Sequence, residues 1–152
     1  MNAAVTVFFL IIKVFSLYFL AVSLFGLCRR RTPEPAARLR RFAVLIAARN
    51  EESCIAGLIE SLRAQHYPPE LVDIWVLPNN CTDRTAEAAR RAGAQVLEMP
   101  ASVRSKGAAL HTAAKALLRS TRNYDAFCVF DADNEADPAF LSEMNRALDR
   151  TA

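Results

Sequence analysis

Apolar residues fill the first 28 positions of the chain almost without interruption. Between Ala3 and Cys28 the only charged side chain is that of Lys13. At the rise of an α-helix this segment spans about 39 Å, more than the roughly 30 Å hydrocarbon core of a bilayer. A cleaved signal peptide is disfavoured, because no charged region precedes the apolar run and no small-residue cleavage site precedes Arg29. The pattern therefore predicts a single membrane-anchoring helix in residues 1–28.

Lys13 is the one residue that opposes this interpretation. A lysine near the middle of a bilayer is costly unless its amine reaches the interface or faces a protein partner. We expect the side chain of Lys13 to extend toward the interface, and contact with a partner helix remains the alternative.

Beyond residue 41, short apolar runs alternate with stretches of helical period. The apolar runs predict buried strands at residues 42–47, 73–77, 95–97 and 126–130. Apolar residues at helical spacing predict intervening helices, with these side chains turned inward: Ile55, Leu58, Ile59 and Leu62 in one, Leu110, Ala113, Ala114 and Leu117 in another. Strands alternating with helices predict an α/β fold with a doubly wound, mostly parallel sheet.

Local signals suggest where the helices begin and end. Ser53 and Thr82 are the expected caps of the first two helices of the folded part, and Gly93 follows the second of them. A last helix is expected from Pro138 to about Asp149, because proline suits a first helical turn. We expect three side chains of this helix to face inward: Leu141, Met144 and Leu148.

Charge is distributed unevenly along the 152-residue chain, whose formal net charge is +3. Residues 29–41 carry six arginines and one glutamate, a local charge of +5, whereas residues 42–152 carry 12 basic and 15 acidic side chains, a balance of −3. This acidic balance excludes a basic nucleic-acid-binding domain. The arginines suit anionic lipid headgroups and place this end of the helix in the cytoplasm by the positive-inside rule.

The chain is therefore predicted to have three parts: a transmembrane anchor in residues 1–28, a basic juxtamembrane linker in residues 29–41 broken by prolines, and a folded domain in residues 42–152. The predicted location is the cell membrane, with the folded domain in the cytoplasm. The four cysteines contain no Cys-x-x-Cys pair, so neither a zinc site nor a disulfide framework is indicated.

Polar residues follow three of the predicted strands, at residues 49–52, 79–83 and 131–134. Ligands of open α/β sheets bind outside the carboxyl ends of the strands, so these loops form the predicted site. Asp131 and Asp133 present two carboxylates one residue apart, which suits a hard divalent cation. On these two residues alone, solvated turn residues or helix caps remain the alternative. No Gly-x-Gly-x-x-Gly or Walker-type glycine loop is present. The acidic residues from Asp131 onward alternate as in a calcium-binding loop, but Ala136 stands where such a loop requires a glycine.

Four segments in order, at residues 48–52, 79–85, 104–110 and 130–134, resemble glycosyltransferase family 2. The resemblance implies the nucleotide-diphospho-sugar transferase fold, of GT-A type, and a site for a nucleotide-diphosphate sugar, with a UDP-sugar expected first. The residues that it assigns to the donor are Arg49, Asn50, Glu51, Asn79, Asn80, Arg104, Lys106 and Asp131. It assigns Mg²⁺ or Mn²⁺ to Asp133, with Asp131 near the ribose or the metal.

Several of these assignments have simpler alternatives. Glu51 and Glu52 could instead be favoured by the positive end of a helix dipole. Thr82 and Asp83 could serve as a helix cap and a dipole partner, and Arg104 could be a solvated surface residue. The family more commonly has aspartate where Asn79 stands. Asn79 can still accept through its carbonyl oxygen, but without the charge, so the identity of the base stays open.

The resemblance implies a membrane-anchored, inverting glycosyltransferase that makes an envelope or extracellular polysaccharide or a glycolipid, with an unknown acceptor. Such a transfer needs a general base, which is expected beyond Ala152, so the chain is interpreted as an inactive fragment that holds the donor half. A non-catalytic, membrane-tethered nucleotide-binding remnant is the alternative. A nucleotidyltransferase is disfavoured, because residues 47–55 lack a glycine-rich loop.

Overall fold

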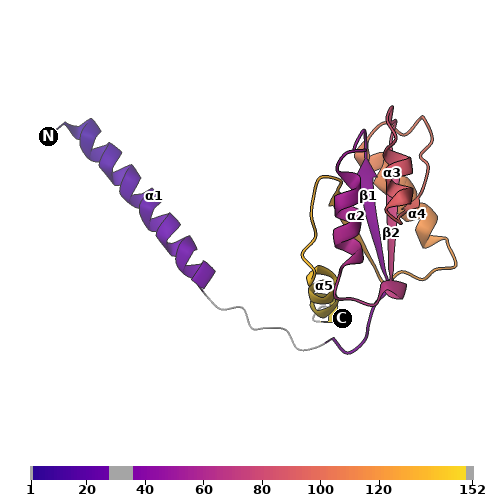
Figure 1. Ribbon diagram of the computed structural model, residues 1–152. Helices are drawn as coiled ribbons and strands as arrows, with labels where there is room; N and C mark the ends of the chain where they lie inside the picture. Colours follow the sequence, from indigo (N-terminus) through magenta and orange to yellow (C-terminus); the bar gives the residue numbers. More distant parts are fainter. Residues whose placement is uncertain (1, 28–35, 150–152) are drawn as a thin grey trace. The chain divides into compact units, whose positions relative to one another are not determined.

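The computed structural model describes residues 2–27 and 36–149 (Figure 1). Contacts divide the chain into two compact units, residues 1–33 and residues 34–152. Of the predicted basic linker, residues 29–35 lie outside the described residues.

The first unit contains helix α1 (Ala3–Leu27). Its segment Val5–Gly26 has 22 residues and a mean hydropathy of 2.4, so it is long and apolar enough to cross a membrane. The hydroxyl of Ser23 donates to the carbonyl of Phe19 at 2.8 Å, which satisfies this polar group within the helix. The predicted role of α1 as an anchor stays a prediction.

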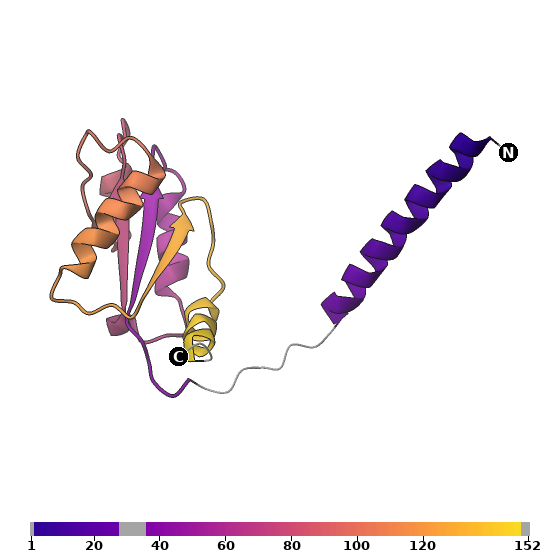
Figure 2. The ribbon, with the colours of Figure 1, turned by 180° about the vertical axis from the view of Figure 1, so that it is seen from behind.

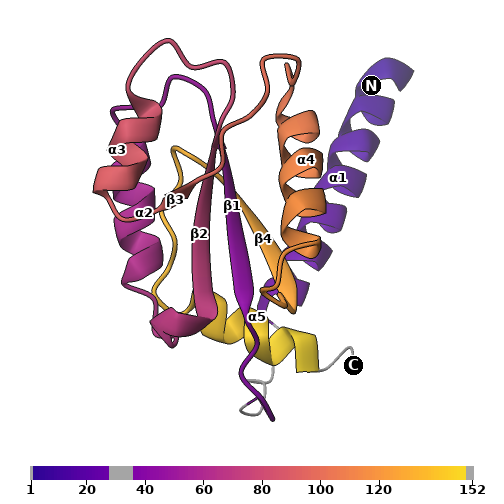
Figure 3. The same ribbon diagram turned by 90° about the vertical axis from the view of Figure 1, so that its right-hand side faces the viewer.

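The second unit is built on a four-stranded sheet in the order β3-β2-β1-β4, in which every pair of neighbours is parallel (Figure 3; other views in Figures 1 and 2). The strands are β1 (Phe42–Ala48), β2 (Val72–Pro78), β3 (Gln95–Val96) and β4 (Ala126–Asp131). The helices are α2 (Ile55–Arg63), α3 (Thr85–Arg91), α4 (Lys106–Leu118) and α5 (Phe140–Asp149), with a 3₁₀ turn η1 (Pro69–Leu71) before β2. The predicted α/β fold with a parallel sheet is confirmed.

Helices cover both faces of the sheet (Figure 3). On one face Val44 and Ile46 of β1 belong to a cluster that includes Leu58 of α2 and Leu141 of α5. On the other face Leu45 packs in a cluster with the following residues: Ala43, Leu77, Ala113 and Leu117. Because β1 is covered on both faces, its sequence is a continuous apolar run and not an alternating one.

The expected caps of α2 and α3 are wrong. Cys54 and Arg84 precede these helices, and neither side chain makes a capping bond. The first amide of α2, that of Ile55, donates instead to the carbonyl of Glu51 at 3.0 Å. At the start of α3 the carboxylate of Asp83 accepts from the amide of Thr85 at 3.0 Å, so the side chain that bonds this helix start lies one position after the predicted cap.

The last helix also differs from the prediction. It begins at Phe140, because the carboxylate of Asp137 accepts from the amide of Ala139 at 2.8 Å before the helix starts. Leu141 is buried as expected, but Met144 is 36% exposed. Asn145 is buried in place of Met144, and its Nδ2 donates to the carbonyl of Arg38 at 2.9 Å. Leu141 and Leu148 therefore pack inward as predicted, and the buried position between them is Asn145 and not Met144.

Arg40 is buried in the folded unit. The hydroxyl of Tyr67 accepts from its amide and donates to its carbonyl, both at 2.8 Å, and its guanidinium pairs with Asp149. Burial raises the pKa of Tyr67 above its ordinary value, which keeps the phenol a hydrogen-bond donor. Arg40 was expected to contact lipid with the other arginines of the linker, but its charge is satisfied inside the protein.

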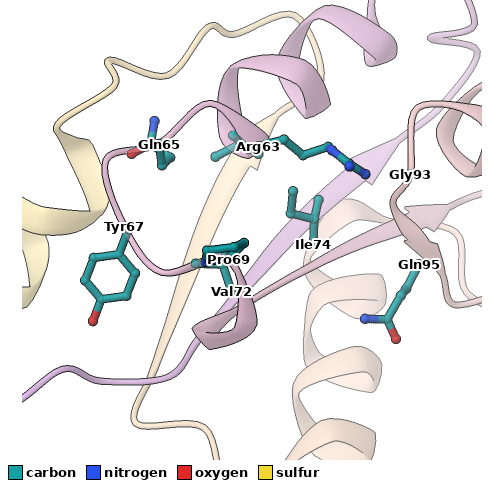
Figure 4. Close-up of a pocket in the computed structure, with 9 residues that line it drawn as sticks. Arg63, Gln65, Tyr67, Pro69, Val72, Ile74, Gly93 and Gln95 are labelled. Carbon is teal, nitrogen blue, oxygen red and sulfur yellow. The ribbon is translucent and has the colours of Figure 1, made fainter.

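Gly93 follows α3 with φ +91°, a conformation that favours glycine. A Cβ there would lie 1.9 Å from Nη1 of Arg63, whose side chain extends toward Gly93 (Figure 4). Replacing Gly93 by alanine is expected to lower the free energy of unfolding by about 1–2 kcal/mol, because the backbone is strained and Arg63 must move. Denaturant unfolding followed by the fluorescence of Trp75, the chain's one tryptophan, measures this change.

Gly57 provides the matched control, because a Cβ at this position in α2 meets nothing within 4 Å. Gly57→Ala should stabilise the protein by about 0.5–1 kcal/mol, as alanine favours a helix. Equal destabilisation by the two substitutions would contradict the strain assigned to Gly93.

Candidate functional site

The carboxyl ends of β1, β2 and β4 border a cavity of about 370 Å³. The last residues of β1 contribute Ala47 and Ala48, whose small side chains leave this space open. The other lining residues follow the strands or lie at the start of α4: Arg49, Glu51, Asn79, Arg104, Lys106, Asp131, Ala132 and Asp133. Residues from all four segments of the family resemblance therefore meet at one edge of the sheet.

Seven of the nine predicted site residues line this cavity, and Asn50 and Asn80 do not. Both of these asparagines have left-handed backbones, with φ of 59° and 52°. The Oδ1 of Asn50 accepts from the amide of Thr82 at 2.8 Å. The Nδ2 of Asn80 donates to the carbonyl of Val103 at 2.8 Å and to Oδ1 of Asn79 at 2.7 Å. These two side chains shape the loops around the cavity and do not face into it.

Lys106 is the first residue of α4, and its amine forms an ion pair with Asp131. Ser105 caps this helix by accepting from the amide of Ala108 at 3.2 Å. The free amides and the positive dipole end of α4 lie beside the lysine, which makes the region suitable for an anion. The charged lining residues are three basic and three acidic side chains, so the charge of the cavity wall sums to zero.

The carboxylates fit a divalent cation that also binds a substrate. The described residues contain no group of three or more His, Cys, Asp or Glu side chains that could hold a metal alone. Mg²⁺ is commonly bound through one or two carboxylates together with substrate phosphates and water, and needs no such cage. Asp133 and Asp131 supply two carboxylates at the cavity, so the donor set matches a cation shared with a phosphate group.

Cys54 contacts the acidic side of the cavity. Its Sγ donates to Oε2 of Glu51 at 3.0 Å. This hydrogen bond, and secondarily burial, raise the pKa of Cys54 to about 11. The thiol therefore remains protonated near neutral pH and helps to orient the carboxylate of Glu51. The sequence carries no signal for this contact.

Thr85 joins the loops that follow β1 and β2. Its side chain is fully buried; Oγ1 accepts from the amide of Glu51 at 2.9 Å and donates to the carboxylate of Asp83. Asp83 also accepts from the amide of Glu52 at 3.1 Å. The hydrogen bond from Thr85 is the main cause of a lowered pKa of Asp83. These bonds fix the two loops against each other beneath Glu51.

A second cavity, of about 260 Å³, lies between the end of α2 and the amino-terminal part of β2 (Figure 4). Arg63 is the only charged residue among its described lining, which otherwise includes Leu62, Tyr67, Val72 and Ile74. None of the predicted site residues borders it. The cavity at the carboxyl ends of the strands is therefore the candidate site.

Residues 43–152 match the family model for glycosyl transferase family 2. The chain belongs to glycosyltransferase family 2. A probable glycosyltransferase, YdaM, of Bacillus subtilis is 28% identical over 108 residues, which are 66% of this chain and 24% of YdaM. A beta-monoglucosyldiacylglycerol synthase of Synechocystis is 30% identical over 92 residues, 59% of this chain and 19% of that protein. The chain thus spans about a quarter or less of these curated relatives.

Solved structures have the same fold. A mannosyltransferase of Pyrobaculum calidifontis, in complex with GDP-Man and Mn²⁺, superposes with a TM-score of 0.70 at 22% identity, over 87% of this chain and 39% of that protein. Glucosyl-3-phosphoglycerate synthase of Mycobacterium tuberculosis gives a TM-score of 0.57 at 27% identity, over 72% of this chain and 40% of that chain. The predicted GT-A-like fold is confirmed.

Proposed function

We propose that this chain forms the donor-binding part of a membrane-anchored glycosyltransferase. Its donor is a nucleoside-diphosphate sugar, for which a UDP-sugar is the first candidate, and its cofactor is Mg²⁺ or Mn²⁺. The proposal depends on one observation: Arg104 and Lys106 line the same cavity as Asp131 and Asp133. Cations for a diphosphate and carboxylates for a metal are both present there.

Each charged group has a distinct role in this proposal. Lys106 moves from its ion pair with Asp131 toward the diphosphate, where the amides at the start of α4 also favour negative charge. Arg104 assists on the same side. Asp133 holds the cation and Asp131 supports the ribose or the metal. When bound, the divalent ion supplies Lewis-acid stabilisation of the leaving diphosphate.

The remaining polar groups position the donor. Arg49 and Glu51 line the nucleotide side, with Cys54 orienting the carboxylate of Glu51. Asn50 and Asn80 act through the loops that they hold. The transfer inverts the sugar and requires a general base at the acceptor hydroxyl. None of the carboxylates of Glu51, Asp131 and Asp133 is assigned that role.

The membrane location rests on α1 and on the sequence that follows it. The helix has the length and composition of a membrane span, and the arginines after it favour a cytoplasmic position for the folded unit. A polysaccharide or a glycolipid is the proposed product class. The name of the Synechocystis relative, a diacylglycerol glycoside synthase, supports a lipid acceptor.

Calorimetry on the full chain in detergent, with Mn²⁺ present, tests donor binding. UDP should bind at one site and about 10-fold more tightly than UMP, because the second phosphate is the group that Lys106 and the cation hold. Uridine should bind more weakly than either nucleotide. Equal affinity for UDP and UMP, or no binding of UDP, would reject the proposal.

A further inference from the structure

Lys106 lies at a position where a positive charge is unfavourable by itself. It is the first residue of α4, and the first turn of this helix contains no acidic side chain. The amino-terminal end of a helix carries a partial positive charge, which repels a nearby cation. Among the described residues, the amine of Lys106 forms one ion pair, with the carboxylate of Asp131. Asp131 is therefore the counterion that makes this position tolerable for a lysine.

The charged side chains that line the cavity are not paired equally. Within the part of the chain that the structure describes, Lys106 and Asp131 form the one ion pair among these six residues. Asp133 lies two residues after Asp131 and forms no ion pair there. Arg104 lies two residues before Lys106 and also pairs with no described carboxylate. An amine thus engages one of the two proposed metal-binding carboxylates, and the other remains without a cationic partner.

The pair between Lys106 and Asp131 is exposed enough to exchange partners. The two side chains are 49% and 57% exposed, so their ion pair contributes little to the stability of the fold. The start of α4 does not depend on the pair, because Ser105 caps the helix by accepting from the amide of Ala108. An amine and a divalent cation bind the same carboxylate oxygens and repel each other. Each therefore weakens the binding of the other to Asp131.

A diphosphate relieves this competition. Its oxygens offer the amine of Lys106 another anionic partner, and the amides at the start of α4 favour the same negative charge. When Lys106 pairs with the diphosphate, the carboxylate of Asp131 is released to act together with Asp133. The same lysine that opposes a divalent cation on its own therefore permits that cation once a diphosphate is bound.

We propose that Lys106 is an exchangeable counterion of Asp131 that couples the binding of the divalent cation to the binding of the diphosphate. The lysine disfavours the cation alone and favours the cation and the diphosphate together. Because such coupling is reciprocal, the factor by which the diphosphate raises the affinity for the cation equals the factor by which the cation raises the affinity for the diphosphate. The inference rests on the proposed function and adds a regulatory contact within the same site.

Lys106→Gln should change the two affinities in opposite directions. Mn²⁺ without nucleotide should bind about 5-fold more tightly, because its competitor and the repulsion from the amine are removed. UDP in EDTA should bind about 10-fold more weakly, because a charged donor to the diphosphate is lost. The full chain in detergent serves for both measurements. The electron paramagnetic resonance signal of hydrated Mn²⁺, which is lost on binding, gives the first affinity, and ligand-observed NMR gives the second.

Lys115→Gln is the matched control. Lys115 is exposed, lies in the last turn of the same helix and does not line the cavity. Loss of its charge should leave both affinities within about twofold, since an exposed charge outside the site interacts weakly through water.

A double-mutant cycle separates competition for Asp131 from a general effect of the lysine charge. In an Asp131→Asn background, Lys106→Gln should change the affinity for Mn²⁺ by less than about twofold, because the shared carboxylate is gone. A 5-fold gain in that background would overturn the inference. An unchanged, lower or undetectable affinity for Mn²⁺ in Lys106→Gln alone would also overturn it, and the proposed function would stand. Failure of the unchanged chain to bind UDP in Mn²⁺ would instead reject the proposed function.

Discussion

Replacing Asp133 by asparagine should weaken the binding of UDP in the presence of Mn²⁺ by about 100-fold. An amide oxygen is a much poorer ligand for a hard cation than a carboxylate, and the diphosphate then lacks the charge that offsets its own. The residual affinity should match that of the unchanged chain in EDTA. The substitution leaves the fold intact, because Asp133 is exposed and follows the last strand.

Glu135→Gln is the matched control for this experiment. Glu135 is also exposed, lies two residues from Asp133 and does not line the candidate cavity. Loss of its charge should change the affinity for UDP by less than about threefold, since Glu135 does not line the cavity and an exposed charge interacts only weakly through water. The metal assignment would be wrong if Asp133→Asn bound UDP in Mn²⁺ as tightly as the Glu135→Gln protein does.

Replacing Thr85 by valine should lower the free energy of unfolding by about 2–4 kcal/mol. Valine keeps the shape of threonine but removes the hydroxyl, so the amide of Glu51 loses its acceptor and the carboxylate of Asp83 loses a donor. A buried donor without a partner costs about 1–3 kcal/mol, and a hydrogen bond to a charged group contributes a similar amount. Denaturant unfolding followed by Trp75 fluorescence measures the loss.

Two further variants separate the hydroxyl from the rest of the threonine side chain. Thr85→Ser retains the hydroxyl and should recover most of the stability. Thr112→Val removes a hydroxyl that bonds only within α4, to the carbonyl of Ala108, and should cost less than about 0.5 kcal/mol. If Thr85→Val cost no more than Thr112→Val, the bonds between the two loops would not stabilise the fold.

The apolar pattern was sufficient to predict the sheet. The run from Phe42 to Ala47 indicated a strand covered on both faces, and β1 lies between β2 and β4 with helices on either side. The same pattern placed the loops after β1, β2 and β4 at one edge, because parallel strands end on the same side. The convergence of Arg49, Asn79 and Asp133 followed from that arrangement, whereas Lys106 was assigned to the site by the family resemblance.

The contacts between loops could not be predicted in the same way. Ser53 and Thr82 were expected to cap helices, but Thr82 instead donates to Asn50, 32 residues away in the chain. The side chain of Asn80 donates both to Oδ1 of Asn79 and to the carbonyl of Val103, and so fixes the orientation of the Asn79 amide. Val103 lies in a loop without any apolar period. A local pattern reports the period and burial of one segment, whereas these bonds depend on how two segments approach each other.

The equal numbers of basic and acidic side chains around the cavity have a consequence for how a donor arrives. The charged side chains of these walls add no net long-range attraction for a nucleoside diphosphate, and the local attraction comes from Lys106 and the amides at the start of α4. A divalent counterion bound to the diphosphate lowers the negative charge that the site must offset. The species best suited to enter is therefore the nucleotide already complexed with its divalent ion.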